Sequence, residues 1–483
     1  MQRQRGESLL LLRSEDVGAA HERLHVVDVR ALRRPGSTDP PLARWWAARA
    51  ATDHDDGAMM KRTTPWMWKL VSGLALVASR ANAVTCDAIP SAVAGGAPAP
   101  LVYIEGANAV GPFLAPLQQA LSVAENPINL VYIGDGGCLG ANDFFGNVAI
   151  PSKPKPIYYA GQVQGTCDLP TTAGPNGGTP VADIAASDVY APSCGTIPGG
   201  QLPPYIGDFL GPVQIFDFVV PKASGQRSIS AAAAYFVFGF GASSGVSPWT
   251  VNESIYRRNA TSAAQALLAV AISVPISRWA GVDAAALPDS VSAGLTGAAA
   301  VINALETDPK PEQAIGILAA TNIDATTASH IDVLAYKDTA QSCSYYPDST
   351  PTAHDKANVR DGHYALWAPI HFFTYVDDHG APRDPLVARI ISYVTQTAVP
   401  PGGLDLIQIE AQQNLVPGCA MRVTRSVEMG PLSSFAPEGS CSCYYDYVAT
   451  GSSSCTPCTK RSDCPDSAPI CNLSQPVGFC ETR

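Results

Sequence analysis

The chain has 483 residues, of which 46% are hydrophobic and 15% are charged, a balance typical of globular domains and not of disordered chains. This length predicts two or three domains. The formal net charge is −11, and nucleic-acid binding needs clustered basic side chains, so we expect no nucleic-acid partner. An acidic chain can still bind a small anion, because backbone N–H groups and one arginine are enough locally.

The first 83 residues contain the pattern of an export signal. Met60-Lys61-Arg62 begins a basic segment, residues 70–79 are apolar, and Ala81-Asn82-Ala83 has the small-x-small form of a cleavage site. The alternatives are a buried helix or a membrane anchor, but the apolar run is shorter than the roughly 20 residues that cross a bilayer. We therefore predict a signal peptide at 60–83 and a periplasmic or extracellular protein that is not integral to the membrane. Residues 1–59 are expected to be a mis-annotated upstream extension or a disordered one.

The body of the chain alternates between short apolar runs and helical patterns. Strands are predicted at 101–104, 130–133, 157–159 and 213–220. Helical spacing joins five apolar residues after a turn at Gly106, namely Val110, Phe113, Leu114, Leu117 and Leu121. A second helix is predicted from Ala263 to Val274, with Thr261 or Ser262 at its start. Strands that alternate with helices indicate an α/β fold with largely parallel sheets.

Four segments have the form of a strand, a turn rich in Gly, Ser or Asp, and then a helix. They are residues 101–113, 131–144, 183–190 and 255–267. In open α/β sheets the ligand binds at the carboxyl ends of the strands, where helix N-termini point. Four such loops in chain order predict one ligand site built from all of them.

These loops resemble those of the phosphate-binding proteins in the type II periplasmic binding protein superfamily. The matching stretches are Gly106–Phe113, Gly134–Cys138, Asp183–Asp188 and Arg258–Ala264, and the segment Asp355–Val376 is also similar. The resemblance covers about residues 100–400. It implies a solute-binding domain at 84–420 with two lobes, each a sheet flanked by helices. Lobe one is then expected at about 95–205 and 345–420, and lobe two at about 206–344.

The resemblance also implies an interlobe site for a small oxyanion, with phosphate favoured, and ABC-type uptake through an importer permease. The implied ligand-binding residues are Ala107, Asn108, Asp135, Gly136, Ser187, Asp188, Arg258, Ser262 and Ala263. A tetrahedral oxyanion offers many acceptor sites, which N–H and O–H donors at helix starts and a charge-assisted contact from Arg258 can satisfy. Asp188 can accept the proton that phosphate keeps and sulfate does not. Hydroxyl side chains that the family usually carries are missing at Ala107, Asn108 and Ala264, which lowers the expected phosphate affinity.

Thirteen cysteines in an exported chain predict disulfides, and the odd total leaves at least one cysteine unpaired or intermolecular. Eight of them lie between Cys419 and Cys480. Residues 440–483 have few large apolar residues and cannot build a core of their own, so the segment 421–483 is predicted to be a cysteine-rich tail that is held by disulfides. A zinc ribbon at Cys455-x-x-Cys458 is the alternative.

Two other functions compete with solute binding. A metal-dependent exported enzyme would use the crowded residues His354, Asp355, Asp361, His363, His371 and Asp377, but their spacing matches no standard zinc pattern. We therefore predict no enzyme activity, no catalytic residues, no metal and no cofactor, and a monomer. The other competitor is a surface or extracellular interaction protein, built on a binding-protein scaffold whose ligand site is degraded.

Overall fold

The computed structural model describes residues 84–92, 98–171, 179–195, 197, 201–324 and 326–482. The predicted extension at 1–59 and the predicted signal peptide at 60–83 lie outside these residues. Among the described helices, none is long and apolar enough to cross a membrane.

A first sheet is formed mainly by the N-terminal part of the described chain. Its strands are β1 (Leu101–Gly106), β2 (Asn129–Gly134), β3 (Ile157–Ala160), β4 (Val163–Thr166), β5 (Ile184–Ser187) and β13 (Trp367–Tyr375), in the order β4-β3-β2-β1-β5-β13. β1 is parallel to both β2 and β5, while β13 returns from far along the sequence and is antiparallel to β5. The strands predicted at 101–104, 130–133 and 157–159 are confirmed.

One long strand, β6 (Ile206–Pro221), belongs to two sheets. Its first half pairs with β13, and its second half pairs with β10 (Ile315–Ala319) and β11 (Ile331–Val333). β8 (Ile255–Arg257) lies parallel to β10, and β9 (Val282–Asp283) lies parallel to β8. The eleven described strands of this network are continuous through β6, so the second sheet begins within β6 and not at a loop.

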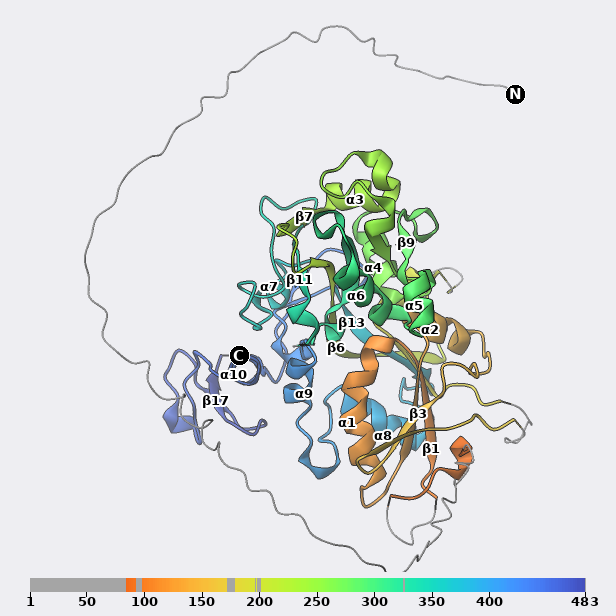
Figure 1. Cartoon of the computed structure of the whole chain (residues 1–483). Coiled ribbons are helices and arrows are strands. Elements are labelled where there is room, and N and C mark those ends of the chain that lie inside the picture. The colour runs from red at the N-terminus through yellow and green to blue at the C-terminus, as the bar shows by residue number, and fades with distance from the viewer. Residues whose placement is uncertain are drawn as a thin grey trace, which may run out of the picture. The chain divides into compact units, whose positions relative to one another are not determined.

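Helices cover both faces of the first sheet. α1 (Gly111–Ser122), α8 (Pro385–Val394) and α9 (Leu406–Gln412) share one apolar cluster with β1 and β2, whereas α2 (Gly137–Phe145) packs on the opposite face. Figure 1 shows α1 and α8 beside the strands of this sheet. α1 forms as predicted, because Phe113, Leu114, Leu117 and Leu121 repeat at helical spacing and are fully buried.

The second sheet is covered in the same way. α3 (Ala231–Phe240) and α4 (Ala263–Ala271) contribute to one apolar cluster, and α6 (Gly297–Thr307) to another on the other face (Figure 1). The predicted helix at 263–274 is confirmed, but it ends three residues earlier. Short elements complete the body: α5 (Pro288–Ser292), α7 (Ala357–Arg360), the pair β7 (Ser228–Ser230) and β12 (Ala335–Lys337), and the pair β14 (Val423–Thr424) and β15 (Ser433–Ser434). The predicted α/β fold, with sheets flanked by helices, is confirmed. The sheets are mixed and not largely parallel, because β3, β6, β11 and β13 pair antiparallel with their neighbours.

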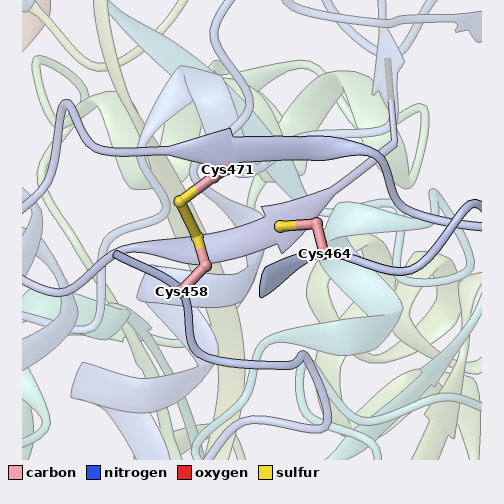
Figure 2. Close-up of side chains that lie close together, drawn as sticks. All are labelled: Cys458, Cys464 and Cys471. Atoms are coloured by element: carbon pink, nitrogen blue, oxygen red, sulfur yellow. A yellow bond between two sulfur atoms is a disulfide. The ribbon is translucent and has the colours of Figure 1, made fainter. Parts of the chain in front are cut away.

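The tail contains α10 (Ser442–Thr450) and a hairpin of β16 (Ile470–Asn472) and β17 (Phe479–Glu481). Three disulfides lie within it, Cys443–Cys455, Cys458–Cys471 and Cys464–Cys480, and Cys419–Cys441 connects it to the body. The sulfur atoms of Cys458, Cys464 and Cys471 lie close together, but Figure 2 shows the first and the last joined by a disulfide. Since Cys455 is also bonded, the zinc alternative does not hold.

The remaining disulfides, Cys86–Cys167 and Cys138–Cys194, both lie in the part of the chain that forms the first sheet. Together the six disulfides use twelve of the thirteen cysteines. Cys343 is free and exposed, as the odd total required.

Candidate functional site

A small pocket lies where loops of the two sheets meet, and it encloses about 20 Å³. The first sheet contributes the carboxyl ends of β1, β2 and β5, and the second contributes those of β8 and β10. The lining residues are Ala107, Asn108, Ala109, Gly136, Gly137, Asp188, Arg258, Ser262, Ala263, Ala264, Ala319 and Asn322. The strand–turn–helix pattern explains this arrangement, because each loop leaves a strand and starts or approaches a helix.

Arg258 supplies the positive charge of the pocket. The residue follows β8 and is 8% exposed, and its Nε is buried without a hydrogen-bond partner among the described residues. No described carboxylate lies within ion-pair distance of its guanidinium. Burial lowers the pKa of Arg258, and the charges of Asp188 and Asp283 oppose that shift without removing it. The guanidinium is therefore a buried cation with donors to spare.

Asp188 faces the same pocket from the first sheet, directly after β5. It is 3% exposed, and its Oδ1 accepts no hydrogen bond from the described part of the chain. Burial raises the pKa of this carboxyl to about 6, against a smaller opposing effect of its own backbone amide, Arg258 and His371. Gly137 makes room for it: a Cβ there would lie 2.6 Å from Oδ1 of Asp188. The pocket therefore holds one buried donor group and one buried acceptor group that the protein leaves unsatisfied.

Two helix N-termini border the pocket. α2 begins at Gly137 and α4 at Ala263, and the first-turn amides of a helix have no partner within the helix. Ser262 is the N-cap of α4, but its hydroxyl accepts no hydrogen bond from the first turn, and the residue is 5% exposed. The partial positive charge of a helix N-terminus and its free N–H groups suit an anion.

Seven of the nine residues implied by the resemblance line this pocket, namely Ala107, Asn108, Gly136, Asp188, Arg258, Ser262 and Ala263. Ser187 lies outside it, because its fully buried hydroxyl donates to the carbonyl of Val189 at 2.9 Å. Asp135 also lies outside it and turns toward Glu105 and Asp143 on the face of the sheet that α2 covers. Burial, followed by the neighbouring carboxylates, raises the pKa of Glu105 to about 9.

Five lining residues were not among those implied: Ala109, Gly137, Ala264, Ala319 and Asn322. Gly137 and Ala264 do lie inside the matching loops. Asn322 belongs to a short 3₁₀ turn after β10. One sequence pattern is consistent with Asn322 as a site residue. The apolar run 315–319 is followed by Thr321 and Asn322, so a strand again has polar residues at its carboxyl end.

The residues of the competing metal site are dispersed. His371 is buried, with its Nδ1 2.8 Å from a carboxylate oxygen of Asp208, whereas Asp361 pairs with Arg422 and His363 stacks on Tyr345. The groups of described residues that could hold a metal ion include none of the six.

A Gly-x-Ser-x-Gly spacing occurs at Gly241–Gly245, but it follows a helix and not a strand, so it does not form the turn of an α/β-hydrolase nucleophile. Ser243 at its centre donates to the carbonyl of Phe240 and is exposed.

No family model and no curated protein matches the sequence. Similar solved structures include an ABC-type phosphate transport receptor from Vibrio cholerae, with 13% identity and a TM-score of 0.40 over 65% of this chain and 99% of that one. A protein described as a phosphate ABC transporter substrate-binding protein with bound phosphate, from Clostridium perfringens, has 9% identity and a TM-score of 0.42 over 66% and 99%. The OxyR regulatory domain from Pseudomonas aeruginosa has 9% identity and a TM-score of 0.30 over 62% and 98%.

Proposed function

We propose that the protein binds a small oxyanion in the pocket between its two sheets, with protonated phosphate as the favoured ligand. The observation that carries this proposal is the pair of Arg258 and Asp188, which come from different sheets, line one pocket and are both buried with unsatisfied polar atoms. A ligand that accepts a hydrogen bond from Arg258 and donates one to Asp188 would satisfy the buried polar atoms of both residues. The amides at the start of α2 and α4 provide further donors.

Asp188 sets the preference among oxyanions. An ionised carboxylate repels an anion unless the anion carries a proton that the carboxylate can accept. Phosphate keeps a proton at neutral pH and sulfate does not, so phosphate gains a hydrogen bond where sulfate meets an unpaired negative charge. A hydrogen bond that involves a charged group contributes about 1.5–3 kcal/mol, which corresponds to a preference of roughly ten- to a hundredfold.

The pocket is too small to hold phosphate as it stands. A cavity of about 20 Å³ holds about one water molecule. Phosphate therefore enters only if the pocket widens. The two sheets approach each other closely at its rim, where a Cβ on Gly136 would lie 3.1 Å from the carbonyl oxygen of Thr261. Ligand binding is thus expected to require a change in the distance between the two sheets.

Calorimetric titration of the full chain with phosphate and with sulfate at neutral pH tests the proposal. We expect saturable phosphate binding, weaker sulfate binding, and a loss of at least tenfold in phosphate affinity in Arg258→Ala. Arg278→Ala is the matched control, because Arg278 is exposed, lies outside the pocket and carries the same charge. Equal affinity in Arg258→Ala and wild type would remove Arg258 from the site.

The second candidate is a surface or extracellular interaction protein on the same scaffold. It is favoured by the lining itself, in which Ala107, Ala263 and Ala264 offer only backbone groups, and by the tail that is covalently attached to the body. Absence of any binding heat or thermal stabilisation with millimolar phosphate would support this candidate over uptake.

Export to an oxidising compartment belongs to both candidates. Its support is the six disulfides, which persist outside the cytosol, together with the signal pattern at 60–83. Sequencing the N-terminus of the secreted protein tests it: a start at residue 84 is expected, and a start before residue 60 would contradict the predicted signal peptide. Delivery of the ligand to an importer permease is the further step that uptake requires.

A further inference from the structure

Three carboxylates meet behind the loops that form the pocket, on the face of the first sheet that α2 covers. Glu105 precedes the last residue of β1, Asp135 follows β2, and Asp143 lies on α2. One oxygen atom from each lies within 4.8 Å of the other two. Glu105 and Asp135 share this face because side chains alternate along a strand, and Ile133 and Tyr103, two residues before them, pack on the same side.

Gly140 brings Asp143 to the other two carboxylates. A Cβ at Gly140 would lie 2.6 Å from Cα of Gly106 and 2.8 Å from the carbonyl carbon of Glu105, so the backbone of α2 contacts the end of β1 directly. Asp143 lies three residues further along α2, on the same face of the helix. The close contact of helix and strand therefore places its carboxylate over Glu105.

The described residues supply no partner for the buried oxygens of this cluster. Glu105 is 0% exposed, and both of its oxygens and both of those of Asp135 are buried without a hydrogen-bond donor. None of the three carboxylates forms an ion pair with a basic side chain in the described part of the chain. An ionised carboxylate that is buried and unpaired is strongly unfavourable, so these oxygens require a cation or a proton.

We propose that Glu105, Asp135 and Asp143 bind a hard divalent cation of the calcium type. Ca²⁺ takes about six to eight oxygen ligands in a flexible geometry, so three carboxylates that meet at one place suit it. Mg²⁺ is usually held by one or two carboxylates together with several waters, so three carboxylates favour Ca²⁺. Asp143 is partly exposed and leaves the ion a route from solvent.

Such an ion would join three elements that carry the pocket. Glu105 lies two residues before Ala107, Asp135 lies next to Gly136, and α2 begins at Gly137, so all three ligands are close to lining residues without being lining residues themselves. The ion would fix these loops from behind and add positive charge near the start of α2. The cation site does not depend on the identity of the anion and can be tested without it.

The experiment uses the full chain, treated with a chelator and transferred to phosphate-free buffer at neutral pH. Calorimetry and thermal unfolding are then followed as Ca²⁺ is added. We expect saturable binding, and a rise in melting temperature of about 5 °C at a hundredfold excess over the dissociation constant. Mg²⁺ should bind more weakly. No binding heat and no shift with millimolar Ca²⁺ would overturn the proposal and leave protons as the occupant of the cluster.

Three variants assign the effect to these residues. Asp143→Asn and Glu105→Gln keep the shape of the side chains and remove a charge, and each should lower Ca²⁺ affinity at least tenfold. Asp289→Asn, at an exposed acid on α5, should leave it unchanged. Sensitised Tb³⁺ luminescence provides a readout that needs no unfolding, since Tyr103 lies on the same face about 7 Å from Glu105. An unchanged Ca²⁺ response in both Asp143→Asn and Glu105→Gln would also overturn the proposal, whereas a retained response in Arg258→Ala separates this site from the oxyanion pocket.

Discussion

The guanidinium of Arg360 on α7 forms an ion pair with Asp446 on α10, which joins the body of the protein to its cysteine-rich tail. Nε of Arg360 also donates to the carbonyl of Ala420 at 3.1 Å, and the guanidinium lies 5.1 Å from the centre of the Tyr445 ring. Tyr445 is itself fully buried in an apolar cluster of the body. The tail is therefore packed against the body and is more than an appended segment.

Replacing Arg360 by alanine should destabilise this attachment. The side chain is 3% exposed and Asp446 is 27% exposed, so the variant leaves a partly buried carboxylate without its partner. We expect the free energy of unfolding to fall by about 3 kcal/mol. Arg422→Ala is the control, because its pair with Asp361 involves an arginine that is 57% exposed and should contribute less than about 1 kcal/mol. Chemical unfolding under non-reducing conditions measures both, and equal losses would contradict the role given to Arg360.

The disulfides of the tail should contribute more to its stability than the packing of its few apolar residues. Cys464 and Cys480 close a loop with a sequence separation of 16, for which removal of the bond is expected to cost about 3 kcal/mol. The double variant Cys464→Ser with Cys480→Ser should expose the tail to limited proteolysis while the two sheets stay resistant. Cys343→Ser, which removes the free cysteine, should change neither property.

Asp188 should make the ligand-free protein less stable as the pH rises. Its folded pKa of about 6 lies above the ordinary value of 3.8, so the folded state binds the extra proton between these values. The associated stability is fully present below about pH 4 and is lost as the pH rises through about 6, by roughly 3 kcal/mol in all. Asp188→Asn removes this dependence and should be more stable than wild type at about pH 8, but not at about pH 4.5.

Unfolding of both proteins by denaturant at these two pH values, in phosphate-free buffer, measures the difference. Other buried acids such as Asp217 titrate in both proteins and cancel in the comparison. The same variant should lose its preference for phosphate over sulfate. If the difference in the free energy of unfolding between variant and wild type is the same at both pH values, the pKa of Asp188 is not raised.

Gly140→Ala should disturb both candidate sites at once. The added Cβ would meet the backbone of Gly106 at 2.6 Å, and backbone cannot rotate away as a side chain can. We expect α2 to shift, with a loss of about 1–3 kcal/mol and weaker binding of both phosphate and Ca²⁺. Gly418→Ala, where a Cβ would meet nothing within 4 Å, should be neutral. Unchanged binding in a folded Gly140→Ala variant would mean that the contact does not position the loops.

Apolar runs and helical periodicity account for the parts of the fold that could be predicted. The strands at 101–104 and 130–133 are continuous apolar runs that the sheet buries on both faces, and the helix that contains Phe113 and Leu117 repeats buried apolar residues at helical spacing. The predicted strand 213–220 is correct but incomplete. Its sequence does not reveal that the strand continues back to residue 206 and serves two sheets, because pairing partners are set by tertiary contacts.

The candidate site could likewise be predicted only in part. The loop resemblance brings Arg258 and Asp188 together, although they are far apart in the sequence and lie on different sheets. It groups Asp135 with them, whereas the alternation along β2 continues through Val131 and Ile133 to Asp135 and places all three on the face that α2 covers. Strand alternation would have assigned this residue correctly. For Asn322, the only signal in the sequence is its position just after an apolar strand, and that signal alone does not predict a place in the pocket.

The extra residue in β6 where it meets β13 bears on how the pocket opens. Between Pro369 and His371 the pairing advances by two residues on β13 but by three on β6, at Gly211 and Pro212. A bulge of this kind bends a strand and increases its local twist, and proline there donates no hydrogen bond to the neighbouring strand. The bulge lies in the part of β6 that pairs with β13, four residues before Phe216, where pairing with β10 of the second sheet begins. Because β6 is one unbroken strand with hydrogen-bonded partners in both sheets, any movement of the sheets apart must bend this strand, and its amplitude is bounded by how far the strand can bend without losing those partners.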